Sequence, residues 1–381
     1  MRLRPFVAGS VVLAVAMGVG RFAYTPLLAI MRVDAGLSIS MAGLLASINL
    51  FGYLAGAALG MLPPLRRHRR RAVIAAPFLV ALLTVMMALG PTTWAAARFV
   101  TGVASGISFV LVTSLLLDFV HERPSPAGIA MLFSGVGIGI AGSGILVDVF
   151  ARAGGSNAAW IGIGVVSLVA LALVVRWLPA DAPPAASAAR AGGALGAPFI
   201  ALAVAYTIEG AAYVIPATFL VVMIRQTPAI AELADAAWIV VGLVAIPSIA
   251  IATWASQRIG AHRALIFATI VQALTFLGPI VLPGALGVAV IAVGLGGTFI
   301  VITALSTSIG RAMWPERSNV IVGLMTVVYG VGQVVGPLFA TWVSLTTGSY
   351  RGALIDAAIA LGVATVALFA VPAGAPRASS P

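Results

Sequence analysis

Residues 179–193 read Pro-Ala-Asp-Ala-Pro-Pro-Ala-Ala-Ser-Ala-Ala-Arg-Ala-Gly-Gly, and this stretch divides the 381-residue chain into two halves. It is rich in proline and glycine and too polar to cross a membrane, so we expect a cytoplasmic linker over residues 179–197. Apolar segments of about 20 residues lie on each side of it. A bilayer core of ~30 Å needs roughly 20 helical residues, and lipid offers no partner to an open backbone. The sequence therefore predicts an all-α membrane protein with twelve transmembrane helices in two pseudo-symmetric six-helix bundles, residues 1–178 and 198–381.

The predicted spans are the apolar segments that lie between polar, proline-rich or glycine-rich stretches. They are predicted at residues 6–31, 40–62, 72–90, 92–117, 126–149, 157–178, 198–224, 236–256, 263–283, 285–310, 319–346 and 350–371.

The distribution of arginine supports this arrangement. With the amino terminus inside, the cytoplasmic arginines are Arg2, Arg4, Arg66, Arg67, Arg69, Arg70, Arg71, Arg123, Arg176, Arg190, Arg258, Arg263, Arg311, Arg317 and Arg377. The outer loops hold only Arg32, Arg152, Arg225 and Arg351. This asymmetry is what the positive-inside rule requires, so we expect a multi-pass protein of the bacterial inner membrane with both termini in the cytoplasm.

The composition excludes several classes of function. At 61% hydrophobic and 8% charged residues, with a mean hydropathy of +1.14, the chain is not an ordinary soluble domain. Its net charge of +11 is spread through loops, which indicates membrane topology rather than nucleic-acid binding. All 21 basic residues are arginine, so there is no Walker A or Schiff-base lysine. Cysteine is absent and His68, His121 and His262 all fall between apolar segments, so we expect no cofactor and no metal.

The two halves of the chain contain similar short sequences. Ala23-Tyr24-Thr25-Pro26 in the first span resembles Ala212-Tyr213-Val214-Ile215-Pro216 in the seventh. Internal repeats that enclose a central site are how many secondary transporters achieve alternating access. The alternative is a chance coincidence of tyrosine and proline.

Local motifs resemble those of the major facilitator superfamily. After the eighth span, residues 257–263 read Gln-Arg-Ile-Gly-Ala-His-Arg, similar to the superfamily's Asp-Arg-x-Gly-Arg-Arg loop motif. Arg98-Phe99-Val100-Thr101-Gly102 is similar to its Arg-x-x-x-Gly motif. Residues 18–28 and 213–220 resemble the YbfB/YjiJ-type branch. The resemblance implies a secondary transporter that moves a small organic solute by rocking two bundles. Because the loop acid and a Gly-Pro pair in the fifth span are missing, the motifs leave uptake and efflux open.

Three ionisable residues lie within the predicted spans, and each is a candidate for function because a charge at bilayer depth is costly. Arg21, Arg98 and Glu209 fall in the first, fourth and seventh spans, which line the cavity in the superfamily resembled. Glu209 is the only carboxylate deep in a span, so it is the predicted proton carrier. The alternatives are a buried ion pair between Arg21 and Glu209, and an Arg98 that locks neighbouring backbone carbonyls.

Polar residues at helical spacing complete the candidate substrate and proton-coupling site. Arg21 shares a helix face with Tyr24 at i,i+3, and Glu209 shares one with Tyr213 at i,i+4. The full set is Arg21, Tyr24, Asn49, Tyr53, Arg98, Glu209, Tyr213, Tyr329 and Gln333. For the pairs Asn49 with Tyr53 and Tyr329 with Gln333, interhelical hydrogen bonds are the competing role.

Two arginines against one glutamate favour an anionic or neutral solute over a cation. We therefore expect a monomeric transporter of a small organic solute, coupled to protons. One alternative is a multidrug or metabolite efflux antiporter with a polar and aromatic cavity. The other is a membrane-embedded enzyme acting on a lipid-linked substrate. Such an enzyme needs acidic or histidine clusters in large outer loops, whereas the loops here offer only scattered acids such as Asp34, Glu232 and Asp235.

Overall fold

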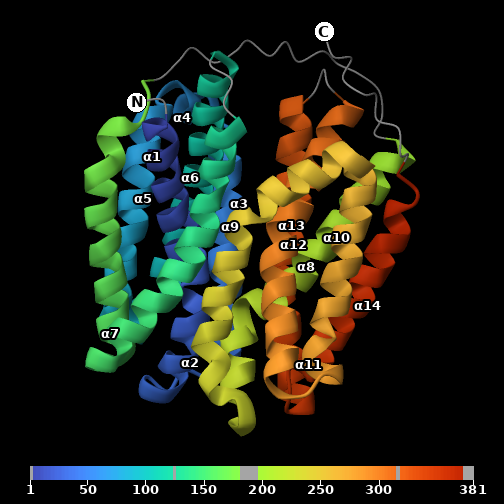
Figure 1. Cartoon of the computed structure of the whole chain (residues 1–381). Coiled ribbons are helices and arrows are strands. Elements are labelled where there is room, and N and C mark those ends of the chain that lie inside the picture. Colours follow the sequence, from blue (N-terminus) through green and yellow to red (C-terminus); the bar gives the residue numbers. More distant parts are fainter. Residues whose placement is uncertain (1–2, 123–125, 181–195, 315–317, 372–381) are drawn as a thin grey trace.

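The computed structural model describes residues 3–122, 126–180, 196–314 and 318–371, and within these ranges the chain forms helices and no strand (Figure 1). Most of the predicted linker, residues 181–195, lies outside the described residues, as do Arg2, Arg123, Arg190, Arg317 and Arg377. Residues 3–180 are called the first half below and residues 196–371 the second half.

The helices follow the predicted spans closely. The first span comprises α1 (Arg4–Leu13), a π-helical segment (Ala14–Phe22) and α2 (Tyr24–Asp34). The others in the first half are α3 (Ile39–Gly60), the short α4 (Pro63–Arg67), α5 (Arg69–Met86), α6 (Pro91–Glu122) and α7 (Pro126–Val174). The second half holds α8 (Ala197–Arg225), α9 (Ala234–Ile259), α10 (Ala261–Phe276), α11 (Gly278–Val281), α12 (Gly284–Met313), α13 (Ser318–Thr347) and α14 (Arg351–Leu368).

Eleven helical segments in the described ranges are long and apolar enough to cross a membrane. One of them, 130–177, has 48 residues. At 1.5 Å per residue it is about 72 Å long, more than twice the thickness of a bilayer core. Its backbone is non-helical at Gly154 and Gly155, where α7 turns back on itself (Figure 1). The two arms of α7 match the predicted spans 126–149 and 157–178, which accounts for the difference between eleven segments and twelve spans.

The second arm of α7 begins with a side-chain cap from another helix. Asp34, at the end of α2, accepts hydrogen bonds from the backbone N–H of Ser156 at 2.6 Å and from its hydroxyl at 3.0 Å. This satisfies a donor that a helix start leaves free. Gly155, at φ +66°, supplies the left-handed conformation that the turn needs.

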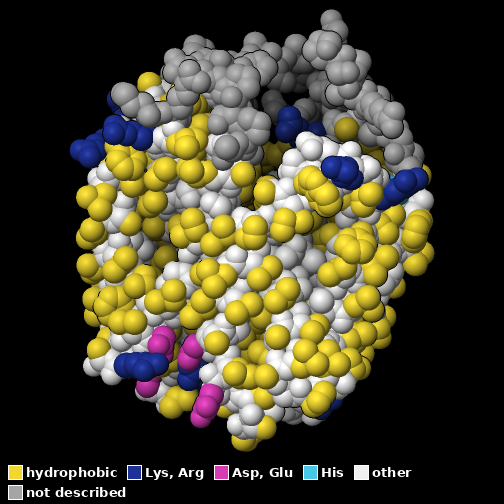
Figure 2. All heavy atoms as spheres, viewed as in Figure 1, with side chains coloured by type: hydrophobic (Ala, Val, Ile, Leu, Met, Phe, Trp, Pro, Cys, Tyr) yellow, Lys and Arg dark blue, Asp and Glu magenta, His cyan; other side chains and the backbone are white. Residues whose placement is uncertain are grey.

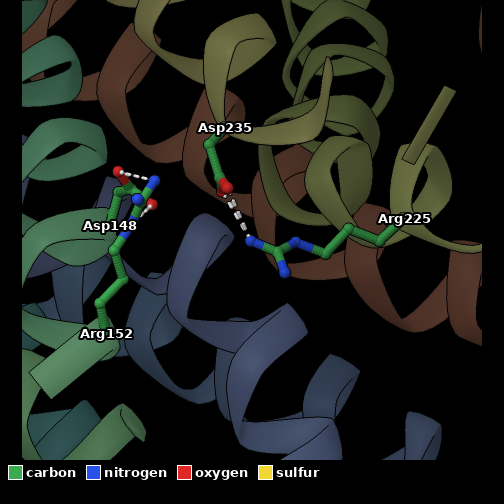
Figure 3. A network of polar contacts seen from close by, with 4 residues as sticks. All are labelled: Asp148, Arg152, Arg225 and Asp235. Carbon is green, nitrogen blue, oxygen red and sulfur yellow. Dashed lines mark hydrogen bonds and ion pairs between the residues drawn. The ribbon is translucent and has the colours of Figure 1, made fainter. Parts of the chain in front are cut away.

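The surface is that of a multi-pass membrane protein. Figure 2 shows apolar side chains over the middle of the molecule, with arginines at one end and a mixture of acids and arginines at the other. At the second of these ends, Arg152 pairs with Asp148 on α7 at 2.9 Å, and Arg225 pairs with Asp235 at 2.8 Å (Figure 3). These pairs are solvent-exposed, so each contributes about 1 kcal/mol or less.

Glycines set the closest helix crossings inside the first half. A Cβ added to Gly52 would lie 2.2 Å from the carbonyl oxygen of Phe99, and one added to Gly102 would lie 2.1 Å from that of Asn49. Helices α3 and α6 therefore approach to backbone contact along a small-residue seam. This seam holds Asn49 of α3 and Arg98 of α6 in register.

The two halves of the chain pack together along three helix pairs. These are α2 with α8, α3 with α13, and α7 with α9. The Thr25 hydroxyl donates to the carbonyl of Ala217, and the Ser47 hydroxyl donates to that of Val334 at 2.9 Å. A Cβ on Gly242 of α9 would lie only 2.2 Å from the backbone nitrogen of Ala141 on α7. The candidate residues of the first and seventh spans are thereby brought face to face.

Candidate functional site

Arg21 lies near the end of the π-helical segment and is 7% exposed. The Gly18-Val19-Gly20 stretch before it allows tight packing, since a Cβ on Gly18 would lie 2.3 Å from the Cα of Gly139 on α7. Wide helical turns of this kind occur frequently at functional sites. The side chain thus starts from a helix that is held close to its neighbour.

The Arg21 guanidinium is surrounded by aromatic rings. Its Nη2 donates a hydrogen bond of 3.0 Å to the hydroxyl of Tyr213, on α8. Its Cζ lies 4.5 Å from the ring centroid of Tyr53 and 5.2 Å from that of Phe22. Its Nε has no hydrogen-bond partner among the described residues. Arg21 is therefore held by a phenol and by ring faces, and the alternative of an ion pair with Glu209 is not what the structure contains.

Arg98 is buried on α6, beside the same part of the first span. Its Nη1 donates to the carbonyl of Gly20 at 3.1 Å, and its Cζ lies 4.4 Å above the Tyr24 ring. Its Nε is also unpartnered in the described part of the chain. The Asn49 side chain donates to the backbone carbonyl of Arg98 at 2.8 Å, which also fixes the backbone of α6 at this residue. Arg98 therefore binds a neighbouring backbone carbonyl, which is the alternative role considered for it in the sequence analysis. Its Nε is still free to donate a hydrogen bond to a ligand.

Both arginines line one small cavity between the halves of the chain. Its walls also include Tyr24, Thr25 and Asn49, and its volume is about 20 Å³. That space holds about one water molecule. In this conformation the halves are closed around the guanidinium groups.

A row of parallel aromatic rings lies next to Arg21 in the second half. Tyr206 stacks on Tyr329 with 4.2 Å between centroids, Tyr329 lies 5.7 Å from Tyr213, and Tyr213 lies 5.6 Å from Phe299. Gln333 donates to the Tyr213 hydroxyl at 2.7 Å. Tyr213 therefore accepts hydrogen bonds from Arg21 of one half and from Gln333 of the other.

Glu209 is 1% exposed on α8, and its carboxylate is not hydrogen-bonded to either arginine. Neither carboxylate oxygen has a hydrogen-bond partner of ordinary geometry among the described residues. The polar side chains that interact with it most closely are those of Gln272, on α10, and Tyr329, on α13. Gln272 is fully buried, and both atoms of its amide are likewise unpartnered.

The nine predicted residues therefore fall into two adjoining groups. In the first group, Arg21, Tyr24, Asn49 and Arg98 line the cavity, Tyr53 and Tyr213 contact the Arg21 guanidinium, and Gln333 bonds Tyr213. The second group consists of Glu209 and Tyr329. Gln272 is not among the candidate residues predicted from the sequence; it falls in the predicted span 263–283. The available signal was an amide at mid-span depth in an otherwise apolar helix.

Comparisons with known proteins agree with this architecture. Residues 13–369 match the family described as "Uncharacterised MFS-type transporter YbfB", which confirms the branch that the sequence motifs resembled. Over 143 residues the chain is 29% identical to the 3-(3-hydroxy-phenyl)propionate transporter of Escherichia coli (strain K12). That match covers 37% of this chain and 35% of the relative, so it spans about a third of either protein.

Solved structures share the fold over nearly the whole length. A variant of the nucleoside transporter NupG superposes with a TM-score of 0.73 at 14% identity, covering 96% of this chain and 99% of that one. A second NupG structure gives 0.68 at 14% identity, with 97% and 99% covered. The predicted superfamily fold is thereby confirmed.

Proposed function

The chain belongs to the family of MFS-type transporters represented by YbfB, and from this premise we propose that it carries a small organic anion across the bacterial inner membrane, coupled to protons. It is a transporter rather than an enzyme. The arginine-rich end, where α1 begins and α14 ends, faces the cytoplasm in this proposal, as the positive-inside rule requires (Figure 1). All residues that line the cavity come from one chain, so a monomer suffices for the proposed transport.

One observation carries the anion preference. Arg21 and Arg98 are buried beside the same cavity, and neither is hydrogen-bonded to a carboxylate within the described residues. A buried guanidinium without a counter-charge costs several kcal/mol. A ligand carboxylate supplies that charge and accepts two parallel hydrogen bonds from a guanidinium edge. The unpartnered Nε atoms of both arginines are donors that such a ligand uses.

The relative from Escherichia coli supports the same substrate class. The hydroxyphenylpropionate in the name of that relative is a small organic carboxylate with an aromatic ring. The cavity here combines two guanidinium groups with the rings of Tyr24 and Phe22, which suits a carboxylate with an apolar body. A neutral solute remains the second choice, since Thr25, Thr218 and Asn49 also offer hydrogen bonds there.

Proton coupling is assigned to Glu209. It is fully buried, lies outside hydrogen-bond reach of either arginine and so is not locked in its charged form. A carboxyl that can gain and lose a proton without an ion-pair partner is suited to carry one across.

Transport requires that the cavity open alternately to each side. We assign this motion to two bundles, residues 1–178 and 198–381, joined by the linker at 179–197. The contacts between halves that such a motion breaks and remakes are the pairs α2 with α8, α3 with α13 and α7 with α9. Inverted or parallel repeats around a midplane site move in this way.

A second candidate function is efflux of planar, apolar compounds. The observation that favours it is the stack of Tyr206, Tyr329, Tyr213 and Phe299, which offers ring faces to a flat molecule. Ring faces also attract organic cations. The two functions therefore differ in the sign of the charge that binds.

The deciding experiment is a thermal-shift screen of the detergent-purified protein with matched triplets of ligands. Each triplet holds one apolar body bearing a carboxylate, a primary amide or an amine. A ligand at 100 times its Kd stabilises by about 2.7 kcal/mol. We expect the carboxylates to raise the melting temperature, the amides to do so weakly, and Arg21→Gln to remove the effect. Stabilisation by amines alone would overturn the anion assignment and favour the second candidate.

A further inference from the structure

Glu209 and Gln272 form a buried pair that anion binding does not use. Their exposed fractions are 1% and 0%, and all four polar atoms of the two side chains lack a hydrogen-bond partner among the described residues. Helix α10 packs mainly on α12 and α14, and its opposite side is strongly exposed at Phe267 and Leu274. Gln272 therefore places an amide on an outer helix. This amide and the Tyr329 hydroxyl are the side-chain groups that interact with the Glu209 carboxyl, which is the only carboxyl buried in the described spans.

Among the described residues, the side chains that interact with the Glu209 carboxyl are uncharged. The titratable groups that face it are Tyr206 and Tyr213 on its own helix and Tyr329 on α13. Helix α12 contributes only the hydroxyls of Thr303 and Thr307 beside Tyr206. On α14 the acid Asp356 is exposed rather than buried in this region.

An amide is chemically suited to a carboxyl that must exist in two protonation states. When the Glu209 carboxyl is protonated, the Gln272 Oε1 can accept a hydrogen bond from its O–H while the Gln272 Nε2 donates one to its C=O oxygen. Toward the carboxylate, Nε2 still donates and only the first bond is lost. An arginine in that place would hold the carboxylate permanently ionised, and a leucine would offer neither bond.

We propose that Gln272 is the positioning residue that serves Glu209 through its proton cycle, with an acid–amide pair in one state and a single amide-to-carboxylate bond in the other. This inference rests on the proposed coupling role of Glu209. In this proposal, Gln272 on the outer helix α10 is the partner of the Glu209 carboxyl and keeps that carboxyl turned away from the arginine cavity. Tyr213, one turn from Glu209 on α8 and bonded to Arg21, is the residue through which the two groups adjoin.

The first measurement is independent of transport. Infrared difference spectra of the purified protein, recorded across a pH titration, report the C=O stretch of a protonated carboxyl. We expect one such band that Glu209→Gln removes and that Gln272→Leu shifts to higher frequency, because the acid loses its hydrogen bonds to the amide while the Tyr329 hydroxyl stays in place. The matched control is Thr269→Val, which removes a buried hydroxyl from the same face of α10 and leaves the band in place. A band that Gln272→Leu leaves unmoved overturns the proposal.

The second measurement separates coupling from a structural role. In proteoliposomes, Gln272→Leu is expected to lower pH-driven accumulation about tenfold, the equivalent of one buried hydrogen bond, while solute counterflow stays within about twofold of the parent. Gln272→Asn keeps the amide but shortens it, so partial coupling is expected. Equal losses of accumulation and counterflow in both variants would overturn the proposal in favour of simple packing. Failure of the parent protein to exchange any anion would count against the proposed function alone, since the infrared band still decides the pairing.

Discussion

Arg21 donates a hydrogen bond of 3.0 Å to the hydroxyl of Tyr213, and this bond joins residues 192 positions apart on opposite halves of the chain. The same hydroxyl accepts from Gln333 at 2.7 Å, so it is shared by two buried donors. A ligand carboxylate that binds Arg21 competes with the phenol for the guanidinium. If the solute binds Arg21 as proposed, its binding is linked to a contact that holds the closed conformation together.

A double-mutant cycle tests this link. Tyr213→Phe keeps the ring and its stacking but leaves the Arg21 and Gln333 donors without their acceptor. We expect Arg21→Gln and Tyr213→Phe to be non-additive in the stability of the ligand-free protein, with a coupling of about 1.5–3 kcal/mol, as for hydrogen bonds to charged groups. Chemical unfolding in detergent measures it. Strict additivity would show that the bond contributes nothing to the closed state.

The two arginines are expected to respond differently to lysine. Arg21→Lys keeps the charge but loses the planar fork, so anion affinity should fall at least about tenfold while the protein remains folded. Arg98→Lys also alters the bond to the Gly20 carbonyl, which lies within the first half, whereas the bond of Arg21 to Tyr213 joins the two halves. We therefore expect Arg98→Lys to lower the melting temperature of the ligand-free protein more than Arg21→Lys does, in addition to weakening anion binding. Thermal shifts with and without a carboxylate ligand separate the two effects. Identical behaviour of the two variants would contradict the division of roles.

Glu209→Gln removes the proposed proton carrier while keeping its shape. We expect loss of proton-driven accumulation and retention of solute exchange, because the arginine cavity is built from other residues. Reconstituted protein, assayed first under a pH gradient and then in counterflow, measures both. Unchanged accumulation would remove Glu209 from the mechanism.

The sequence predicts the fold because the cost of placing a residue in a bilayer is local. The length of an apolar segment and the number of arginines in a loop depend only on neighbouring residues in the sequence. The spans, and the depth of Arg21, Arg98 and Glu209 within them, can therefore be predicted without any tertiary contact. Partners cannot be inferred in this way. That Arg21 bonds Tyr213 rather than Glu209, and that Gln272 faces Glu209, depends on helix rotation and tilt, which packing against several neighbours sets.

The glycine seam between α3 and α6 makes a stability prediction with a matched control. Gly102→Ala places a Cβ 2.1 Å from the Asn49 carbonyl oxygen, so the two backbones must separate, at a cost of about 1–3 kcal/mol. Gly142→Ala, on α7, meets no atom within 4 Å and should leave the melting temperature unchanged or slightly higher. Thermal unfolding of the two variants provides the comparison. Equal melting temperatures would mean that the helices are not in backbone contact.

The crossing of α7 and α9 makes a prediction about motion. Gly242→Ala introduces a Cβ 2.2 Å from the backbone nitrogen of Ala141 in the other half, so it should weaken the closed contact rather than the fold of either half. The chain contains no cysteine, and Thr25→Cys therefore places a single thiol on the wall of the closed cavity.

We expect a membrane-impermeant maleimide, added on the side away from the arginine-rich end, to label this thiol faster when Gly242→Ala is also present. A loss of about 1.4 kcal/mol in the closed contact corresponds to a tenfold rise in the open population and in the labelling rate. Gly142→Ala, on the facing helix α7, is the control and should not change that rate. If both glycine variants label alike, the α7–α9 crossing does not control access to the arginine cavity from that side.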